Sequence, residues 1–353
     1  MLNKSHLIKD KLLKWYDANR RELPWRFESL RSSNAYHVWL SEVMLQQTTV
    51  ATVKSRFISF ISRWPTVFDL ANATLDEVLH EWQGLGYYTR ARNLHKCAQE
   101  IVSVYKGYFP DNEADLLKLP GIGEYTAAAI VAIAFGRVSA PVDGNIMRVI
   151  SRLNQIAMPM PKGKIRVAEI VSSLMPLDRP GDFTQAMMDL GAVICRPKRP
   201  KCYSCPCSAE CLTFKNGVTE QYPFRMNKKV KGVRCGKVFW INDCGGRVLM
   251  RRRPDQGLLA GMMEFPSTNW DMGSLKNDSF SDEIEALSMN WITISRPVKH
   301  TFTHFNLSLT IWKGEVRSDT EVPDGVWVDP TDFRKYALPS LMKKVVKAVA
   351  VAG

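Results

Sequence analysis

The stretch CRPKRPKCYSCPCSAEC, Cys195–Cys211, contains five of the eight cysteines of the chain. Four of them follow the spacing Cys195-x6-Cys202-x2-Cys205-x5-Cys211, and four thiolates at this spacing can close around one metal centre. We expect the fifth thiol, Cys207, not to be a ligand. Structural zinc sites usually pair two short cysteine knuckles, whereas a four-iron cluster tolerates uneven spacing. The spacing alone leaves zinc and an iron–sulfur cluster open.

The cysteine loop divides the chain into two parts with different secondary-structure patterns. Before it, apolar residues recur at helical spacing, which predicts helices over 41–61, 74–82, 91–105, 124–136 and 182–194. After it, short β-branched and aromatic stretches predict strands over 237–241, 247–252, 305–314 and 325–328, and a closing helix over 341–350. We therefore expect a multi-domain protein, with an all-α region over 1–214, a basic linker over 215–232 and an α+β domain over 233–353.

The charge of the chain indicates its class of partner. With 48 Lys and Arg against 35 Asp and Glu, the net charge is +13. This excess favours a polyanion, and nucleic acid rather than a membrane surface, because no basic amphipathic stretch stands out. The N-terminus lacks a secretory signal pattern, and the longest apolar run, 127–135, is far shorter than the roughly 20 residues of a membrane span. We expect a cytoplasmic monomer whose cysteines stay reduced.

A glycine-rich turn precedes one of the predicted helices. In the sequence Leu119-Pro120-Gly121-Ile122-Gly123, the two glycines permit a tight turn that exposes amide groups beside a helix N-terminus. Such amides can bind a phosphate oxygen, although a plain loop between two helices has the same sequence pattern.

Two carboxylates stand out as candidates for acid–base chemistry. Asp143 precedes Gly144 between two helical stretches, where an aspartate is usually a turn or cap residue and less often a carboxylate at a cleft. Glu42 lies in a largely apolar helical stretch. The simpler interpretation places it on the solvated face; if it faces a pocket instead, desolvation raises its pKa and suits it to general-acid catalysis.

These motifs together resemble a known family. LPGIG, VDGN (142–145) and the four-cysteine loop resemble the helix–hairpin–helix DNA glycosylases that carry a four-iron, four-sulfur cluster. Adenine DNA glycosylases of the MutY type are similar in further motifs over nearly the whole chain: PWR (24–26), WLSEVMLQQT (39–48), GLGYYTRARNLH (84–95), TQAMMDLGA (184–192) and HTFTHF (300–305).

The resemblance implies a role for each matching residue. Glu42 matches the general acid that protonates adenine at N7, and Asp143, with Asn145 in the same motif, matches the carboxylate that stabilises a cationic sugar. The residues implied in DNA and base binding are Trp25, Arg26 and Gln185 at the adenine pocket, Gln47 and Tyr87 beside the lesion, and Gly121 and Gly123 in the hairpin. The implied cofactor is a [4Fe-4S] cluster held by Cys195, Cys202, Cys205 and Cys211. The implied partner is double-stranded DNA with adenine opposite 8-oxoguanine or guanine.

Position 125 separates two reaction types within this superfamily. The endonuclease III-like lyases carry a lysine two residues after the second hairpin glycine, where this sequence has Tyr125. A phenol cannot form a Schiff base, so we expect a monofunctional glycosylase, and a bifunctional glycosylase/lyase is the alternative.

The C-terminal domain resembles a Nudix domain through GLLAGMMEFPS (257–267). The stretch 268–288 lacks the glutamate-rich pattern that a Nudix pyrophosphatase needs for magnesium, so we expect a Nudix-like fold without its catalytic box. The resemblance to MutY-type glycosylases implies that this domain recognises 8-oxoguanine. Phe302, Thr303 and His304 match the recognition loop of the family, with threonine where the family pattern has serine. A non-catalytic DNA-binding protein with a cysteine-held metal also fits the charge, the cysteines and the hairpin, but it leaves Glu42 and Asp143 unexplained.

Overall fold

The computed structural model describes residues 2–26, 34–224, 231–254, 257–270, 284, 286–287, 290–316 and 325–352. The contacts divide the chain into two compact units. The first comprises Met1–Asn72 and Asn93–Lys228, and the second comprises Ala73–Arg92 and Lys229–Gly353. The predicted domain limits at 214 and 233 stay predictions, and residues 225–230 of the predicted linker lie outside the described residues.

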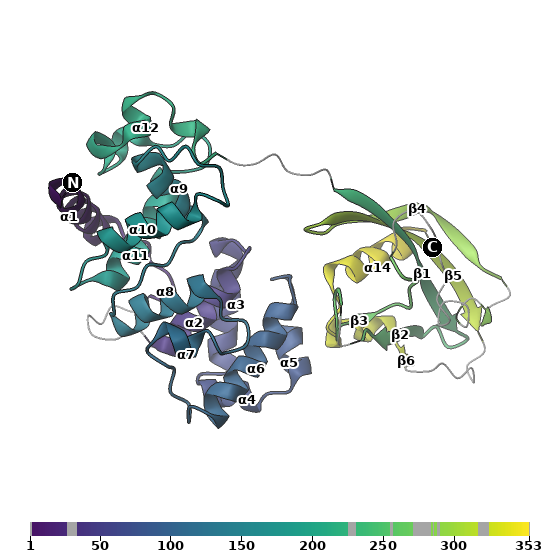
Figure 1. Ribbon diagram of the computed structural model, residues 1–353. Helices are drawn as coiled ribbons and strands as arrows, with labels where there is room; N and C mark the ends of the chain where they lie inside the picture. The colour runs from purple at the N-terminus through teal and green to yellow at the C-terminus, as the bar shows by residue number, and fades with distance from the viewer. Residues whose placement is uncertain are drawn as a thin grey trace. The chain divides into compact units, whose positions relative to one another are not determined.

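The first unit is helical (Figure 1). The helices that lie wholly within it are α1 (Leu2–Asn19), α2 (Ala35–Leu45), α3 (Val50–Arg63), α4 (Val67–Asn72), α7 (Glu113–Leu116), α8 (Glu124–Phe135), α9 (Gly144–Leu153), α10 (Lys164–Leu174), α11 (Pro180–Asp189) and α12 (Leu212–Lys215). Helix α6 (Thr89–Ser103) begins four residues before the first unit resumes at Asn93, and α5 (Leu75–Glu81) belongs to the second unit.

The predicted helix over 41–61 is wrong in one respect, because the structure breaks it into α2 and α3. Gln47 adopts a left-handed backbone conformation with φ 57°, which ends the first helix. Thr49 then caps the second helix, since its side chain accepts a hydrogen bond from the Thr52 amide at 3.3 Å. Both helices have apolar faces at the same periodicity, and this periodicity alone does not reveal the turn.

Helix α8 lies at the centre of the first unit and packs against α2 and α11. Its alanine-rich sequence lets neighbouring helices approach closely, and Ala127, Ala129 and Ala132 are fully buried. Helix α11 continues into a π-helical turn, Leu190–Ile194, which leads into the cysteine loop. A second cluster of buried residues, shared by α1, α9, α10 and α11, supports that loop.

The second unit contains a mixed sheet formed by β1 (Gly232–Asp243), β2 (Val248–Arg252), β3 (Met263–Glu264), β4 (Ile292–Thr301), β5 (Phe305–Val316) and β6 (Gly325–Val328). Its strand order is β3-β2-β1-β5-β4, and β6 pairs with β2. Strands β1 and β5 are parallel, while β1–β2 and β4–β5 are antiparallel. Helix α14 (Ser340–Ala352) packs against β4 (Figure 1).

The four predicted strands and the closing helix of this unit are confirmed, whereas β3 and β4 were not predicted. In β4 most side chains are exposed and only Val298 is buried, so the strand lacks the alternation of apolar and polar residues that marks a half-buried strand. A register shift between Ile294 and Val298 interrupts its pairing with β5 and further obscures the pattern.

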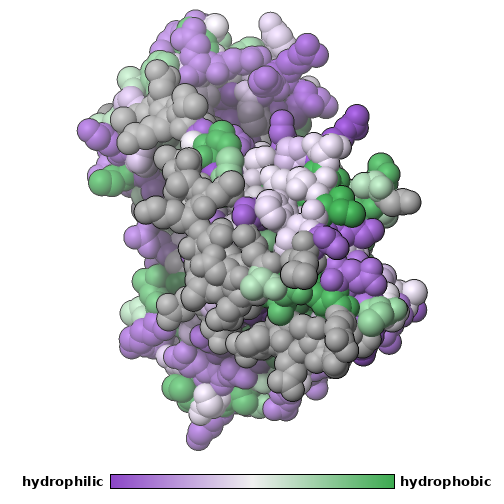
Figure 2. Space-filling view, turned by 90° about the vertical axis from the view of Figure 1, so that its right-hand side faces the viewer, coloured by the Kyte–Doolittle hydropathy of each residue, from purple (hydrophilic) through white to green (hydrophobic). Residues whose placement is uncertain are grey.

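Among the described residues, no helix combines the length and the apolar character that a membrane span requires. On the face shown in Figure 2, hydrophobic residues lie in small groups among hydrophilic ones. Scattered apolar residues of this kind are ordinary on protein surfaces.

Candidate functional site

Glu42 lies on a helix that is buried on nearly all sides. Its neighbours Ser41 and Val43 are also buried, and only 6% of Glu42 is exposed. The helix therefore has no solvated face at this position, and the alternative of a surface glutamate is wrong. The carboxyl group instead faces the interior, where its chemistry depends on the few polar groups around it.

Those groups give Glu42 the properties of an acid. Burial raises the pKa of Glu42 to about 7, although the Tyr125 hydroxyl, which donates a hydrogen bond to Glu42 Oε2 at 2.7 Å, acts in the opposite direction. The Asp143 carboxylate raises the pKa further and the Arg26 guanidinium lowers it. A carboxyl group with a pKa near 7 is substantially protonated at neutral pH and can donate that proton.

A cavity of about 410 Å³ adjoins this carboxyl group. It brings together four residues that the sequence predicted at one site, Trp25, Arg26, Glu42 and Gln185. The other lining residues, which sequence reasoning missed, are Arg21, Leu23, Val38, Ser41, Leu45, Val50, Ile133 and Met188. Mixed apolar walls with a few converging polar groups are typical of a pocket for a flat heterocycle.

Asp143 is the N-cap of α9, as expected of an aspartate before glycine, and its side chain is half-buried. Its Oδ1 accepts the Ile146 amide at 2.6 Å at the start of α9, and its Oδ2 accepts Asn145 Nδ2 at 2.8 Å. Burial raises the pKa of Asp143, and these two hydrogen bonds oppose the shift without cancelling it. Asp143 and Tyr125 do not line the 410 Å³ cavity. Each affects the pKa of Glu42, which does line it.

A hydrogen-bonded path leads from Asp143 to the cysteine loop. Asn145 Oδ1 accepts Arg148 Nη2 at 2.8 Å, and Arg148 Nε donates to the Cys195 carbonyl at 2.7 Å. Sequence reasoning missed Arg148, although its spacing from Asn145, one helical turn, was a usable signal. The path fixes the Asp143 side chain relative to the first cysteine of the loop.

The hairpin glycines lie where a DNA phosphate could reach them. Both Gly121 and Gly123 are exposed, and Gly123 caps α8 without a side-chain hydrogen bond, so the first amides of that helix have no capping side chain. Gly121 has φ 78°, and a Cβ there would lie 2.8 Å from the Asn93 Cβ. Glycine is therefore required at position 121 by conformation and by space.

The predicted lesion-probing residues share an unusual backbone. Gln47 in the first unit and Tyr87 in the second have φ values of 57° and 49°. Strained residues of this kind concentrate at functional sites. Within the second unit, the Tyr87 hydroxyl lies 2.9 Å from the Thr303 hydroxyl. Phe302 and Phe305 close a tight turn through a backbone hydrogen bond of 2.9 Å, and this turn leaves Thr303 and His304 exposed.

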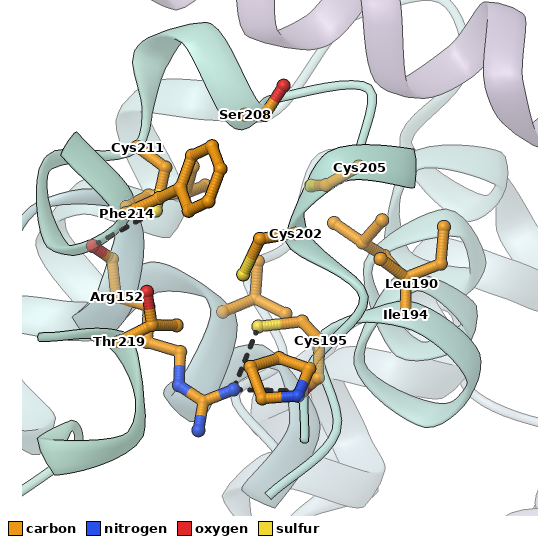
Figure 3. A pocket seen from close by; sticks show the side chains of 13 residues that line it. Arg152, Leu190, Ile194, Cys195, Cys202, Cys205, Ser208, Cys211, Phe214 and Thr219 are labelled. Carbon is orange, nitrogen blue, oxygen red and sulfur yellow. Dashed lines mark hydrogen bonds between the residues drawn. The ribbon is translucent and has the colours of Figure 1, made fainter. Parts of the chain in front are cut away.

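The four cysteines of the spacing motif line one cavity of about 360 Å³ (Figure 3). Cys195, Cys202, Cys205 and Cys211 all contribute to its walls, whereas Cys207 packs into the hydrophobic core. Within the described chain, no three Cys, His, Asp or Glu side chains converge closely enough to hold a metal ion. The thiols therefore surround a space instead of meeting at a point.

Arg152 lies against this cavity and is almost fully buried. Its guanidinium donates to the Cys195 Sγ at 3.3 Å and to the carbonyl oxygens of Arg196, Pro197 and Tyr222 at 2.7, 3.0 and 2.9 Å. None of these hydrogen-bond acceptors is a carboxylate. Burial raises the pKa of the Cys195 thiol, so a negative charge to balance Arg152 would come from thiolates bound to a metal centre.

Comparison with known proteins places these features in a family. Residues 40–174 match the HhH-GPD superfamily base excision DNA repair protein family, and residues 237–348 match the NUDIX domain family. The solved structure of a thermostable thymine-DNA glycosylase is 29% identical, with a TM-score of 0.55 over 61% of this chain and 98% of that chain. The predicted order, a helix–hairpin–helix glycosylase domain followed by a Nudix-like domain, is confirmed.

Full-length relatives agree with this assignment. The human adenine DNA glycosylase is 33% identical to the chain, and the alignment covers 95% of the chain and 72% of the human protein. The adenine DNA glycosylase of Buchnera aphidicola subsp. Schizaphis graminum is 31% identical, with 95% of the chain and 96% of that protein covered. Because a relative at this identity is matched over nearly its whole length, the chain belongs to the adenine DNA glycosylase family.

Proposed function

We propose that the protein hydrolyses the N-glycosidic bond of adenine paired with 8-oxoguanine or guanine in double-stranded DNA, as a monofunctional glycosylase. The observation that carries the proposal is the buried Glu42 carboxyl, with a pKa raised to about 7, beside a cavity lined by Trp25, Arg26 and Gln185. A base inside a duplex cannot be reached, so adenine would have to be flipped out into this cavity.

Glu42 supplies the proton in this mechanism. The bond between the sugar C1′ and adenine N9 breaks, its electron pair goes to the base, and the Glu42 proton goes to N7. Tyr125 holds Glu42 Oε2 through its hydroxyl, which leaves the second carboxyl oxygen free for the proton transfer. A protonated leaving group lowers the barrier because adenine departs as a neutral molecule.

Asp143 supports the cationic sugar that this step creates. Its two oxygens are already held by the Ile146 amide and the Asn145 side chain, so the carboxylate need not reorganise as charge develops. Water then adds to C1′ and loses a proton, which leaves an abasic site. Two carboxyl groups with different environments thereby divide the acid and the electrostatic tasks.

The cysteine cavity fits a [4Fe-4S] cluster better than a single zinc ion. Four thiols surround a space instead of a point, which favours a cluster, whereas the buried Arg152 guanidinium would balance the negative charge of either thiolate-bound centre. Cys195, Cys202, Cys205 and Cys211 would hold the cluster, which when bound cross-links the loop Cys195–Cys211. The loop carries Arg196, Lys198, Arg199 and Lys201, whose cationic side chains suit a DNA backbone.

The remaining predicted residues suit the recognition of the duplex. The exposed hairpin amides at Gly121 and Gly123 would bind a phosphate, and Gln47 and Tyr87 would probe the base stack. The turn with Phe302, Thr303 and His304 would contact 8-oxoguanine. We expect a monomer to suffice and the protein to act in the cytoplasm.

Release of adenine from a duplex with adenine opposite 8-oxoguanine tests the proposal. The parent protein should release the free base, and strand cleavage should follow only after alkali or heat opens the abasic site. Borohydride should trap little protein–DNA adduct, since Tyr125 offers no amine. Efficient trapping and nicking would favour the endonuclease III-like lyase, and binding without base release would favour a non-catalytic DNA-binding protein. A broad visible absorbance would identify the iron–sulfur cluster, because zinc is colourless.

A further inference from the structure

Asp189 is a fully buried carboxylate at the end of α11 that takes no direct part in the mechanism above. It accepts hydrogen bonds from two arginines. Arg26 Nη1 donates to Oδ2 at 2.7 Å and Arg26 Nη2 to Oδ1 at 2.9 Å, which is a bidentate pair. Arg21 donates through Nε to Oδ1 at 2.7 Å and through its amide to Oδ2 at 3.1 Å. Asp189 thus holds two cations on one carboxylate.

Both arginines line the cavity next to Glu42. Burial alone would raise the pKa of Asp189, but its hydrogen bonds and charge interactions with Arg26 and Arg21 outweigh burial and lower it. For Arg26, burial lowers the pKa, and its contacts with Asp189 more than offset that effect. Arg26 and Asp189 therefore stay ionised as a pair.

We propose that Asp189 is a positioning residue for the adenine pocket, which fixes the Arg26 guanidinium in the cavity that Glu42 also lines and balances its charge there. This inference rests on the proposed function and assigns a role to a residue that does not line the cavity. The geometry carries it: a bidentate pair leaves the guanidinium one orientation, whereas an unpaired arginine side chain has many rotamers.

Loss of the Asp189 charge should change the acidity of Glu42. The groups that act on Glu42 are Tyr125 from α8, Asp143 before α9 and Arg26. Among these, Arg26 is the cation, and Asp189 is its counter-ion. In Asp189→Asn the shape is kept while the positive charges of Arg26 and Arg21 lose their shared counter-ion, so the ionised form of Glu42 is favoured.

The test is the pH dependence of single-turnover adenine release by four full-length proteins: the parent, Asp189→Asn, Arg26→Gln and the double variant. The rate should fall at high pH as Glu42 loses its proton. In Asp189→Asn this fall should move to lower pH by about 0.5–1 unit. The double variant should move it back towards the parent, because the unbalanced cation has gone. Asp182→Asn is a matched control on the same helix, where Asp182 forms a surface ion pair with Arg179 at 2.8 Å, and it should leave the profile unchanged.

A purely structural role for Asp189 predicts a different result. The rate of Asp189→Asn would then drop by the same factor at every pH and Arg26→Gln would not restore the profile, which overturns the inference. If Asp189→Asn fails to fold, the test rests on Arg26→Gln alone. Removal of the cation should move the fall in single-turnover rate to higher pH. A pH profile identical to that of the parent would contradict the proposal. A parent protein that releases no adenine at any pH would sink the proposed function itself, which distinguishes the two failures.

Discussion

The first unit buries Glu42 and Glu210 and the second buries Glu264, and of these Glu42 and Glu264 have opposite surroundings. Glu42 in the first unit is hydrogen-bonded by the neutral hydroxyl of Tyr125. Glu264 in the second unit is fully buried between two arginines, with Arg251 Nε 2.9 Å from Oε1, Arg253 on Oε2 and the Ser267 hydroxyl 3.2 Å from Oε2. Glu42 and Glu264 are therefore buried to a similar extent, but Glu42 has a neutral hydrogen-bond partner and Glu264 has two cationic ones.

The comparison shows that the partners, not burial alone, decide what a buried carboxyl group does. A carboxylate between two guanidinium groups is stabilised as an anion and holds strands together. A carboxyl group with a neutral donor and a nearby carboxylate keeps its proton to a higher pH. Glu264 lies in the Nudix-like stretch 257–267, so in this chain a glutamate of that stretch is engaged in a structural ion pair.

The largest effect should be the loss of activity in Glu42→Gln. The amide keeps the shape but cannot donate a carboxyl proton, so single-turnover adenine release should fall by about 10²–10⁴-fold, the usual contribution of a general acid. At neutral pH the urea midpoint should not fall below that of the parent, because no ion pair is broken and the amide does not carry the cost of the raised pKa of Glu42. Mismatch binding, measured by fluorescence anisotropy, should persist. A rate near that of the parent would show that the proton comes from another group.

Glu264→Gln should have the opposite effect, on stability and not on catalysis. It leaves Arg251 and Arg253, whose side chains are 17% and 18% exposed, without their anion. Removal of one partner of a buried pair costs about 3–5 kcal/mol, which urea unfolding of the full chain can measure. Glu315→Gln, an exposed position on β5, is the control and should change stability by less than about 0.5 kcal/mol. An unchanged midpoint in Glu264→Gln would remove the basis of the comparison.

The pH dependence of stability should reveal the raised pKa of Glu42. The pKa of Glu42 is about 7 in the folded chain against 4.5 for the free side chain, so the folded state binds more protons between these values. Stability from this group is therefore fully present below about pH 4.5 and is lost as the pH rises to about 7, which amounts to about 3 kcal/mol. Subtracting the Glu42→Gln profile from the parent profile isolates this term. A flat difference would contradict the raised pKa.

Sequence periodicity predicted most of the elements but not every boundary. The strands over 305–314 and 325–328 and the helix over 341–350 were predictable because their apolar residues repeat with the period of the element. The turn at Gln47 and the strand β4 were not, since the first interrupts a continuing periodicity and the second has one buried side chain. Such features depend on tertiary contacts that no short window contains.

The site residues divide in the same way. Glu42, Arg26 and Gln185 lie in separate motifs, and only the resemblance to a family joined them before the structure placed them around one cavity. Arg148 and Arg152 lie outside the quoted motifs, and Asp189 lies in TQAMMDLGA (184–192) without an assigned role, because a buried ion or hydrogen bond is defined by residues far apart in sequence. Burial and partners, which determine the acidity of Glu42, become visible only in three dimensions.

The smallest expected effect concerns the recognition turn of the second unit. Thr303→Val keeps the shape of the side chain and removes the hydroxyl that lies 2.9 Å from the Tyr87 hydroxyl. One lost hydrogen bond is worth about 0.5–1.5 kcal/mol, so the preference for adenine opposite 8-oxoguanine over adenine opposite guanine should fall by roughly 2–10-fold. The ratio of the two single-turnover rates measures this preference and cancels any general loss of activity. Thr303→Ser keeps the hydroxyl and should leave the ratio within about twofold of the parent. If Thr303→Val leaves the ratio unchanged, the Thr303 hydroxyl does not contribute to recognition of the oxidised base. The proposed recognition of 8-oxoguanine by the second unit would then depend on Phe302 and His304.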